Sequence, residues 1–186
     1  MTRLRGVLGL LGCLVLALVV AVVAPDPAQD LRRRWTDGEV GAWAASPDRV
    51  ARVGAVSVVR SADPGYGQPF TTGQALVVTE IDVQVLHRRT QLSRVYLSTR
   101  DGQQYDPRSE FVAAGPSLTQ PGFTLHSTLV FEVPLRRLDG AELVVDADGA
   151  SVDGYADAIR VDLGLRDPVR VGPETVTPAE STVTTT

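Results

Sequence analysis

From residue 51 onward, apolar and polar side chains alternate with a period of two, the period of a β-strand that buries one face. The clearest example covers residues 76–86. Its odd-numbered positions are mostly apolar, whereas the even-numbered positions from Glu80 to Gln84 are polar. This pattern predicts a half-buried antiparallel strand whose odd-numbered side chains point into a core.

Shorter alternating segments recur at intervals of roughly 8 to 20 residues, with turn-forming residues between them. No segment after residue 24 shows a helical stripe of apolar positions. A series of short strands with turns between them is typical of an all-β, immunoglobulin-like antiparallel β-sandwich. The further strands that we expect cover residues 49–59, 94–98, 103–105, 129–133, 143–145 and 159–163.

Two glycines predict tight turns between these strands: Gly102, which follows an aspartate, and Gly122, which follows a proline. Glycine adopts the positive φ that such turns require at no steric cost. In the strand after the second turn, we expect Phe131 to be a large core side chain between the sheets. Pro134 should end that strand, because proline lacks the N–H donor that a ladder needs.

Residues 6–24 form one uncharged apolar run, which is long enough to cross a bilayer as a helix. After a short N-terminal segment, residues 1–5, we therefore expect a transmembrane signal anchor at 6–24 whose partner is the lipid bilayer. Arg3 and Arg5 precede the run and Arg32–Arg34 follow it, so the positive-inside rule does not by itself orient the chain. Because long downstream domains tend to be translocated, we predict a single-pass protein of the cell membrane with an extracytoplasmic C-terminal domain.

Two alternatives for this segment remain open. Cleavage after Ala24 would release a secreted protein, although Pro25 would then be its first residue. Lipidation at Cys13 is the other alternative, since Leu10–Cys13 resembles a lipobox. The apolar run continues well past Cys13, which favours a plain anchor helix in which this cysteine is a small apolar residue.

The rest of the chain divides by composition. Residues 25–47 carry the arginine cluster and are expected to be a juxtamembrane linker. Residues 48–165 contain the alternating segments and predict the β-sandwich domain. Residues 166–186 are rich in proline, threonine and valine with no pattern, and predict a disordered tail.

Charge and residue usage exclude several classes of function. The net charge is −4, so no basic footprint for nucleic acid exists. Cys13 is the only cysteine, which excludes an intramolecular disulfide and a cysteine-based zinc finger. All 18 basic residues are arginine and asparagine is absent, a bias typical of a high-GC, actinobacterial genome.

Several short segments together resemble one family of bacterial exported domains. They are the strand that follows Gly73, residues 95–105 with their Asp-Gly-x-x-Tyr turn, the Pro-Gly turn, and the Phe-x-Val-Pro strand at 129–134. The family is labelled telomeric-repeat-binding-factor-2-like and is related to mycobacterial immunoprotective extracellular antigens. The resemblance covers roughly residues 50–165. It implies an immunoglobulin-like sandwich of unknown function, with no catalytic residues to assign.

An acidic segment, residues 146–157, is the strongest candidate for a metal site. Asp146, Asp148, Asp153 and Asp157 supply the oxygen ligands that calcium prefers, although their spacing does not match a helical calcium loop. The alternative is an acidic loop that joins two strands through Asp-Gly turns. No other cofactor is expected.

Two histidines and a few aromatic residues complete the candidates. His87 and His126 are both expected at strand ends, and neither has a nucleophile at a known motif spacing. Exposed aromatic side chains often dominate binding surfaces. The candidates for such a contact surface are Trp35, Trp43, Tyr66, Phe70, Tyr105 and Tyr155.

The function that these patterns favour is a membrane-anchored, non-catalytic, extracytoplasmic module that binds a protein or an envelope component. An accessory subunit of a membrane complex is one form of this prediction. A calcium-binding or hydrolytic domain that uses the acidic segment with His87 and His126 is one alternative. A passive spacer or secreted antigen is the other, and in it the tail, residues 166–186, contacts the cell wall.

Overall fold

The computed structural model describes residues 33–87, 90–91, 94–111, 118–146 and 156–185. The chain divides into two units, Met1–Arg33 and Arg34–Thr186, and the second unit contains the β fold. The predicted anchor at 6–24 lies outside the described residues, as do the segment 1–5 and residues 25–32. Among the residues that are described, no helix is long and apolar enough to span a membrane.

The first of two main sheets, called sheet A here, has five strands. The strands β6, β10 and β11 form its antiparallel centre, with Leu143 of β10 opposite Leu97 on one side and Val161 on the other. In spatial order, sheet A consists of β1 (Arg33–Glu39), β11 (Ala156–Asp162), β10 (Glu142–Asp146), β6 (Arg94–Ser98) and β7 (Gln104–Tyr105).

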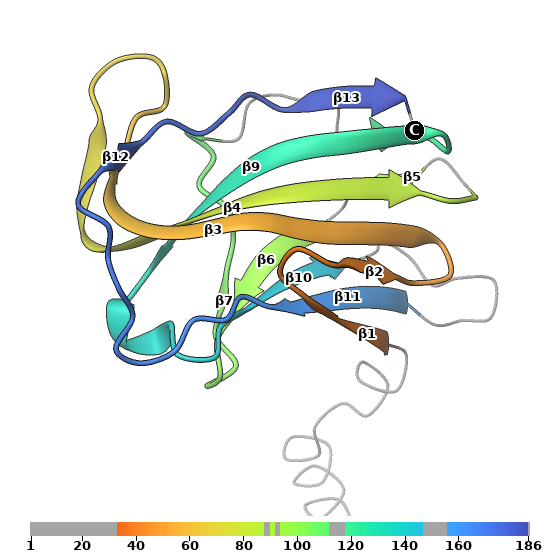
Figure 1. The fold of residues 1–186 in the computed structure, drawn as a ribbon, viewed down its shortest axis with the longest axis horizontal. Coiled ribbons are helices and arrows are strands. Elements are labelled where there is room, and N and C mark those ends of the chain that lie inside the picture. Colours follow the sequence, from red (N-terminus) through yellow and green to blue (C-terminus); the bar gives the residue numbers. More distant parts are fainter. Residues whose placement is uncertain (1–32, 88–89, 92–93, 112–117, 147–155, 186) are drawn as a thin grey trace, which may run out of the picture. The chain divides into compact units, whose positions relative to one another are not determined.

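The second main sheet, sheet B, is built on three long antiparallel strands that run side by side (Figure 1). In spatial order, sheet B consists of β12 (Thr175–Val176), β3 (Arg49–Ala62), β4 (Phe70–Val85), β9 (Phe123–Val133) and β13 (Thr182–Thr185). A short strand, β2 (Trp43–Ala45), also pairs with β3. Two-residue strands β5 (Thr90–Gln91) and β8 (Leu118–Thr119) form a separate ladder, and η1 (Leu135–Arg137) is a 3-10 turn.

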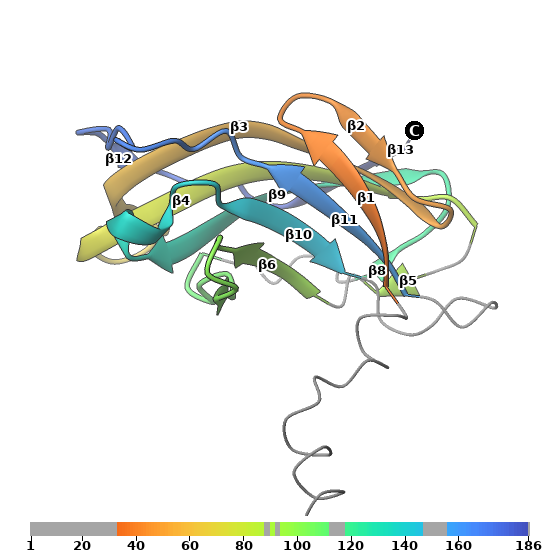
Figure 2. The ribbon, with the colours of Figure 1, turned by 90° about the horizontal axis from the view of Figure 1, so that it is seen from below.

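The two main sheets pack face to face, as Figure 2 shows. Phe131 of β9 and Val77 of β4 are fully buried in one cluster with Leu143 of β10 and Ile159 of β11. The predicted all-β class and β-sandwich are therefore confirmed.

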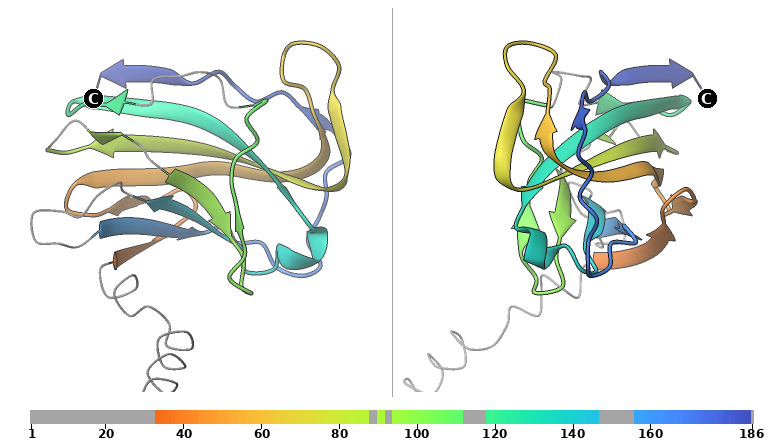
Figure 3. Two further views of the ribbon diagram at one scale, coloured as in Figure 1. Left: turned by 180° about the vertical axis from the view of Figure 1, so that it is seen from behind. Right: turned by 60° about the vertical axis from the view of Figure 1, so that its left-hand side comes forward.

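The predicted alternation in residues 76–86 matches the observed strand β4. Val77, Ile81 and Val83 are buried in the core, whereas Glu80 is exposed on the opposite face. The long β3–β4 hairpin, drawn orange to yellow, forms a loop at one end of sheet B (Figure 3). β3 and β4 have 14 and 16 residues, so β3 continues past the predicted end at residue 59 and β4 begins before the predicted start at residue 76.

The predicted turns and strand end are also found. Gly102 and Gly122 have φ angles of +78° and +86°, the left-handed region that glycine adopts without strain. β9 ends at Val133, and Pro134 begins the η1 turn.

Two predicted boundaries are wrong in the described residues. Part of the predicted linker at 25–47 forms β1 and β2, which belong to the sheets. Part of the predicted disordered tail at 166–186 forms β12 and β13, which pair with β3 and β9. These strands lie at sheet edges, where they are held by backbone hydrogen bonds to a partner strand. They lack the apolar alternation by which a strand is detected in the sequence.

A second apolar cluster lies on the outer face of sheet B, the face turned away from sheet A. It joins Val59 of β3, Val78 of β4 and Val130 of β9 under Phe111, a residue of the β7–β8 connection. Phe70 packs edge-on against Phe111 with ring centroids 6.2 Å apart. In this half of the sheet, the long strands are therefore buried on both faces.

We predict that Phe131→Ala lowers the free energy of unfolding by about 3 to 5 kcal/mol, because the fully buried ring leaves a cavity between the sheets. Chemical denaturation followed by circular dichroism measures the change. Leu86→Ala is the control, since Leu86 is 40% exposed, and it should cost about 0.5 kcal/mol or less. Equal losses in the two variants would contradict the assigned core.

Candidate functional site

The acidic segment is only partly within the described structure. Asp146 ends β10 and Asp157 lies in β11, and both side chains are buried. Asp148 and Asp153 lie outside the described residues. Asp157 accepts a hydrogen bond from Nε of Arg34 at 2.6 Å, so its charge is balanced by an arginine.

No group of three or more metal-ligating side chains is found in the described ranges. The calcium site thus remains a prediction that depends on residues 147–155.

The two histidines lie in different surroundings. His87 is exposed just after β4, close to a strand end as predicted. The prediction for His126 was wrong, because it lies inside β9, opposite Asp82 of β4. His126 belongs to sheet B whereas Asp146 and Asp157 belong to sheet A, so the predicted hydrolytic grouping is divided between two sheets.

A line of polar and aromatic side chains crosses the open half of the outer face of sheet B. The ladder places Trp43 of β2 opposite Arg52 of β3, Arg52 opposite Asp82 of β4, and Asp82 opposite His126 of β9. Thr184 of β13 lies diagonally from His126, whose direct ladder partner is Thr182, and the Thr184 hydroxyl bonds to the imidazole. We call Trp43, Arg52, Asp82, His126 and Thr184 the polar row.

Each member of the polar row is held by its neighbour. The guanidinium carbon of Arg52 lies 4.9 Å from the centre of the Trp43 ring, a cation–π contact. Arg52 Nε donates to Oδ2 of Asp82 at 2.9 Å. The Asp82 side chain is only 14% exposed, whereas Arg52 and His126 are 40% and 39% exposed. The carboxylate therefore anchors two side chains that remain accessible to a partner.

The hydrogen bonds of His126 define its tautomer. Its Nδ1 lies 2.5 Å from Oδ1 of Asp82, and its Nε2 lies 2.8 Å from the hydroxyl of Thr184. An ionised carboxylate only accepts hydrogen bonds, so Nδ1 carries the proton. In the neutral imidazole, Nε2 then accepts from the Thr184 hydroxyl. This chain of bonds links β13 to the centre of the sheet.

A hydroxyl, a histidine and an aspartate also stand in this order in Ser-His-Asp acyl-transfer triads. Such catalysis needs hydrogen-bond donors for an oxyanion in a site that excludes water. His126 instead lies on an open sheet face. A hollow of about 450 Å³ lies elsewhere, between Val56–Val58 of β3 and residues 164–174. The polar row thus lacks, among the described residues, the enclosure that such catalysis requires.

The other half of the outer face carries a closed ionic cluster. Arg108 lies 4.1 Å over the Phe70 ring and forms ion pairs with Glu110 and Glu132. The hydrogen bond with Glu110 raises the pKa of Arg108 above its usual value and lowers the pKa of Glu110. Thr72 donates a further hydrogen bond to Glu132. The guanidinium group of Arg108 is therefore already paired with carboxylates of this chain.

Arginines also gather at the end of sheet A where β11 finishes. A polar hollow of about 400 Å³ is lined there by residues that include Arg100 and Arg166. Arg100 pairs with Asp139 at 2.9 Å, and Arg166 pairs with Asp162. Because each of these guanidinium groups has a carboxylate partner, the hollow has no excess positive charge to attract an anion.

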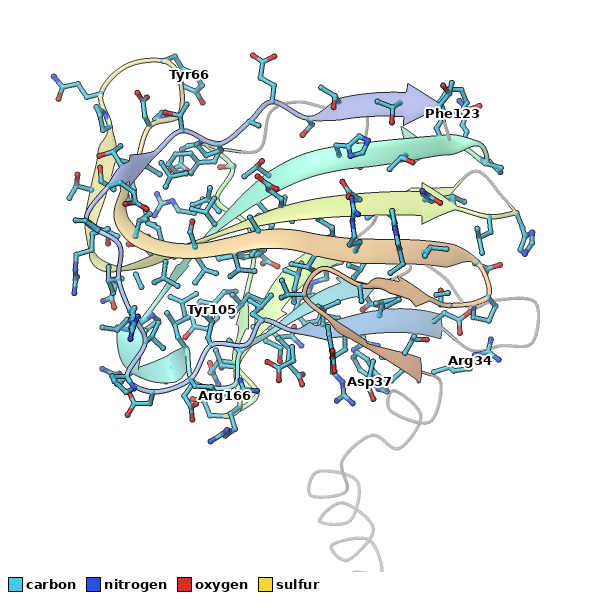
Figure 4. The ribbon with its side chains drawn as sticks, in the orientation of Figure 1. Arg34, Asp37, Tyr66, Tyr105, Phe123 and Arg166 are labelled. Atoms are coloured by element: carbon cyan, nitrogen blue, oxygen red, sulfur yellow. The ribbon has the colours of Figure 1, made fainter. Side chains whose placement is uncertain are left out.

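The predicted aromatic candidates are distributed over the surface. Trp35 and Trp43 are 39% and 43% exposed, and Tyr66 is 69% exposed. Figure 4 places Tyr66 and Phe123 at opposite ends of sheet B. Phe70 and Tyr105 are half-buried, and Tyr155 lies outside the described residues. Of the exposed aromatic candidates, Trp43 is the one that belongs to the polar row.

The sequence pattern did not predict the polar row. It predicted that Asp82 faces away from the core, but the other members come from four different strands. The signal that could have found them is the set of polar residues on exposed faces of alternating strands. Only the register between strands shows which of these residues are neighbours.

Comparison with known proteins adds information on the fold alone. No family model matches the chain, and no curated protein matches it either. It is similar to the solved structure of the yjhA protein from Bacillus subtilis, with a TM-score of 0.50 and 12% identity over 67% of this chain and 99% of that one. An uncharacterised β-sandwich protein from Clostridium difficile 630 gives a TM-score of 0.41 at 12% identity, over 68% and 95% of the two chains.

We predict that Asp82→Asn loosens the polar row. The variant loses the ion pair with Arg52, and this loss should lower the free energy of unfolding by about 1 to 2 kcal/mol. The asparagine amide also no longer requires a proton on His126 Nδ1. Nitrogen-15 chemical shifts of the imidazole should show the Nδ1–H form in the native protein and a shift toward the Nε2–H form in the variant. Glu80→Gln, on the same strand and face, is the control and should leave the imidazole unchanged.

We also predict that the Arg166–Asp162 ion pair makes stability depend on pH. Hydrogen bonds from Arg166 lower the pKa of Asp162 below its unfolded value. Its contribution is therefore present above the unfolded pKa, about 3.9, and is lost as pH falls through the lower folded value. Urea unfolding at pH 7 should show Asp162→Asn less stable than the native chain by no more than about 1 kcal/mol, with a smaller difference at pH 3. In an Arg166→Ala background, Asp162→Asn should not lower the free energy of unfolding any further. An equal loss in that background would show that the ion pair does not contribute to stability.

Proposed function

We propose that this chain is a membrane-tethered, non-catalytic β-sandwich that binds another protein through the polar row. The observation that carries this proposal is the row itself, which presents Trp43, Arg52 and His126 on an open sheet face. Tryptophan and arginine are the residues most enriched among the few that dominate binding energy at protein interfaces.

The arrangement of the row supports a binding role because its side chains are held before a partner arrives. Asp82 fixes Arg52 from one side and His126 from the other, and Arg52 in turn stacks on Trp43. Side chains that are already ordered lose less conformational entropy on binding. The other half of the outer face is covered by Phe111 and its neighbours, which leaves the half with the row for a partner.

The location belongs to the same proposal. The apolar run at 6–24 supports an anchor in the cell membrane, with the sandwich on the extracytoplasmic side. The resemblance to exported bacterial domains of immunoglobulin type supports the same location. The use of arginine for every basic residue supports an actinobacterial source. Secretion after cleavage of the run would leave the binding surface intact.

The spacer alternative is less well supported than it was from sequence. It assigned envelope contact to the tail, residues 166–186. That segment contains β12 and β13, which pair with the long strands of sheet B. Deletion of the tail would remove two strands of the sandwich. If the deleted protein were no longer retained in the envelope, the loss would therefore not show that the tail itself makes the contact.

We predict that a partner recovered by cross-linking in the native membrane depends on Trp43. In cells that produce tagged full chain, Trp43→Ala should reduce recovery of a specific partner by about tenfold or more, because interface tryptophans often contribute over 2 kcal/mol. Mass spectrometry identifies and quantifies what is captured.

Trp35→Ala is a closely matched control. Trp35 is also about two-fifths exposed and also lies under an arginine, Arg160, at 5.4 Å, but it belongs to sheet A. Recovery should be unchanged in this variant. A partner lost equally in both variants, or in neither, would contradict binding through the polar row.

A further inference from the structure

Strand β13 forms an edge of sheet B, and none of its four residues is charged or a proline. Edge strands are normally shortened, charged, bulged or interrupted by proline, which prevents pairing with other chains. The four residues of β13, Thr182–Thr185, are uncharged, β-branched and all exposed. Their register with β9 is regular over the whole strand.

The other edges of the two main sheets are protected in the described residues. β7 and β12 have two residues each, and β2 has three. β1 carries Arg34, Asp37 and Glu39 among its seven residues. β13 is thus the edge that best fits an added strand, since among the described residues no other strand of its sheet pairs with its far side.

We propose that β13 pairs antiparallel with β13 of a second copy of this chain. A two-fold axis normal to sheet B, passing beside Val183, makes the contact self-complementary. Val183 then lies opposite its own counterpart, and Thr182 lies opposite Thr184 of the other copy. β-branched and Thr–Thr cross-strand pairs stabilise such ladders, and no charges are brought together.

The same axis keeps both outer faces on one side of the joined sheet, because side chains directly opposite each other in a ladder share a face. Thr184 already bonds to His126, so its side chain points to the outer face. The two polar rows would therefore lie on one continuous surface, one row on each side of the β13–β13 seam. A second copy of this chain supplies the added strand, so the pairing requires no other protein.

A disulfide trap tests this pairing on the full chain reconstituted in phosphatidylcholine vesicles. Cys13→Ala removes the native thiol, and Val183→Cys places a new thiol next to the proposed axis. Mild copper–phenanthroline oxidation should then give a covalent dimer at a rate at least tenfold above the control. The control is Cys13→Ala with Val40→Cys, because Val40 and Val183 are 40% and 41% exposed and Val40 is in the β1–β2 connection.

A second measurement does not depend on oxidation. Sedimentation velocity of the detergent-solubilised chain should show dimers that increase with concentration. Val183→Lys should abolish them by placing two ammonium groups opposite each other, whereas Val40→Lys should preserve them. A chain that stays monomeric at all concentrations, or equal cross-linking at positions 40 and 183, would overturn the proposal.

Discussion

The antiparallel register of β3, β4 and β9 is the constraint on which the rest of this structure depends. Side chains alternate between the two faces of a strand, so a shift of any one of these strands by one residue would move its core-facing side chains to the outer face. The observed register buries Phe131 and Val83 against sheet A and leaves Asp82 outside. The same register brings Arg52, Asp82 and His126 into one line. One strand register thus determines both the core on the inner face of sheet B and the candidate site on its outer face.

The outer face of sheet B is divided between two physical environments. Over one half, Phe111 covers an apolar cluster and Arg108 is enclosed by its own carboxylates. Over the other half, the polar row stays open to solvent. Arginine has a different role in each half, because Arg108 completes a closed cluster whereas Arg52 stacks under an exposed tryptophan. The proposed partner binding therefore uses the open half.

The edges of the sandwich show how backbone pairing extends a fold beyond its apolar core. β1 and β13 bury little apolar surface of their own, and both lie in segments that composition assigned to a linker and a disordered tail. Each is placed by hydrogen bonds to a neighbouring strand and by side-chain contacts, such as Arg34 with Asp157 and Thr184 with His126. An uncharged edge such as β13 remains able to accept another strand.

Hydrophobic alternation by itself determined the all-β class, the buried face of β4 and the core position of Phe131, because a period of two is a local property of a half-buried strand. Glycine chemistry likewise determined the turns at Gly102 and Gly122. Only the tertiary structure decided that Trp43, Arg52, Asp82, His126 and Thr184 are neighbours, since this depends on strand register. It also decided that Asp157 pairs with Arg34, more than a hundred residues away. Local periodicity contains no information on such distant pairing, which arises when strands pack and align.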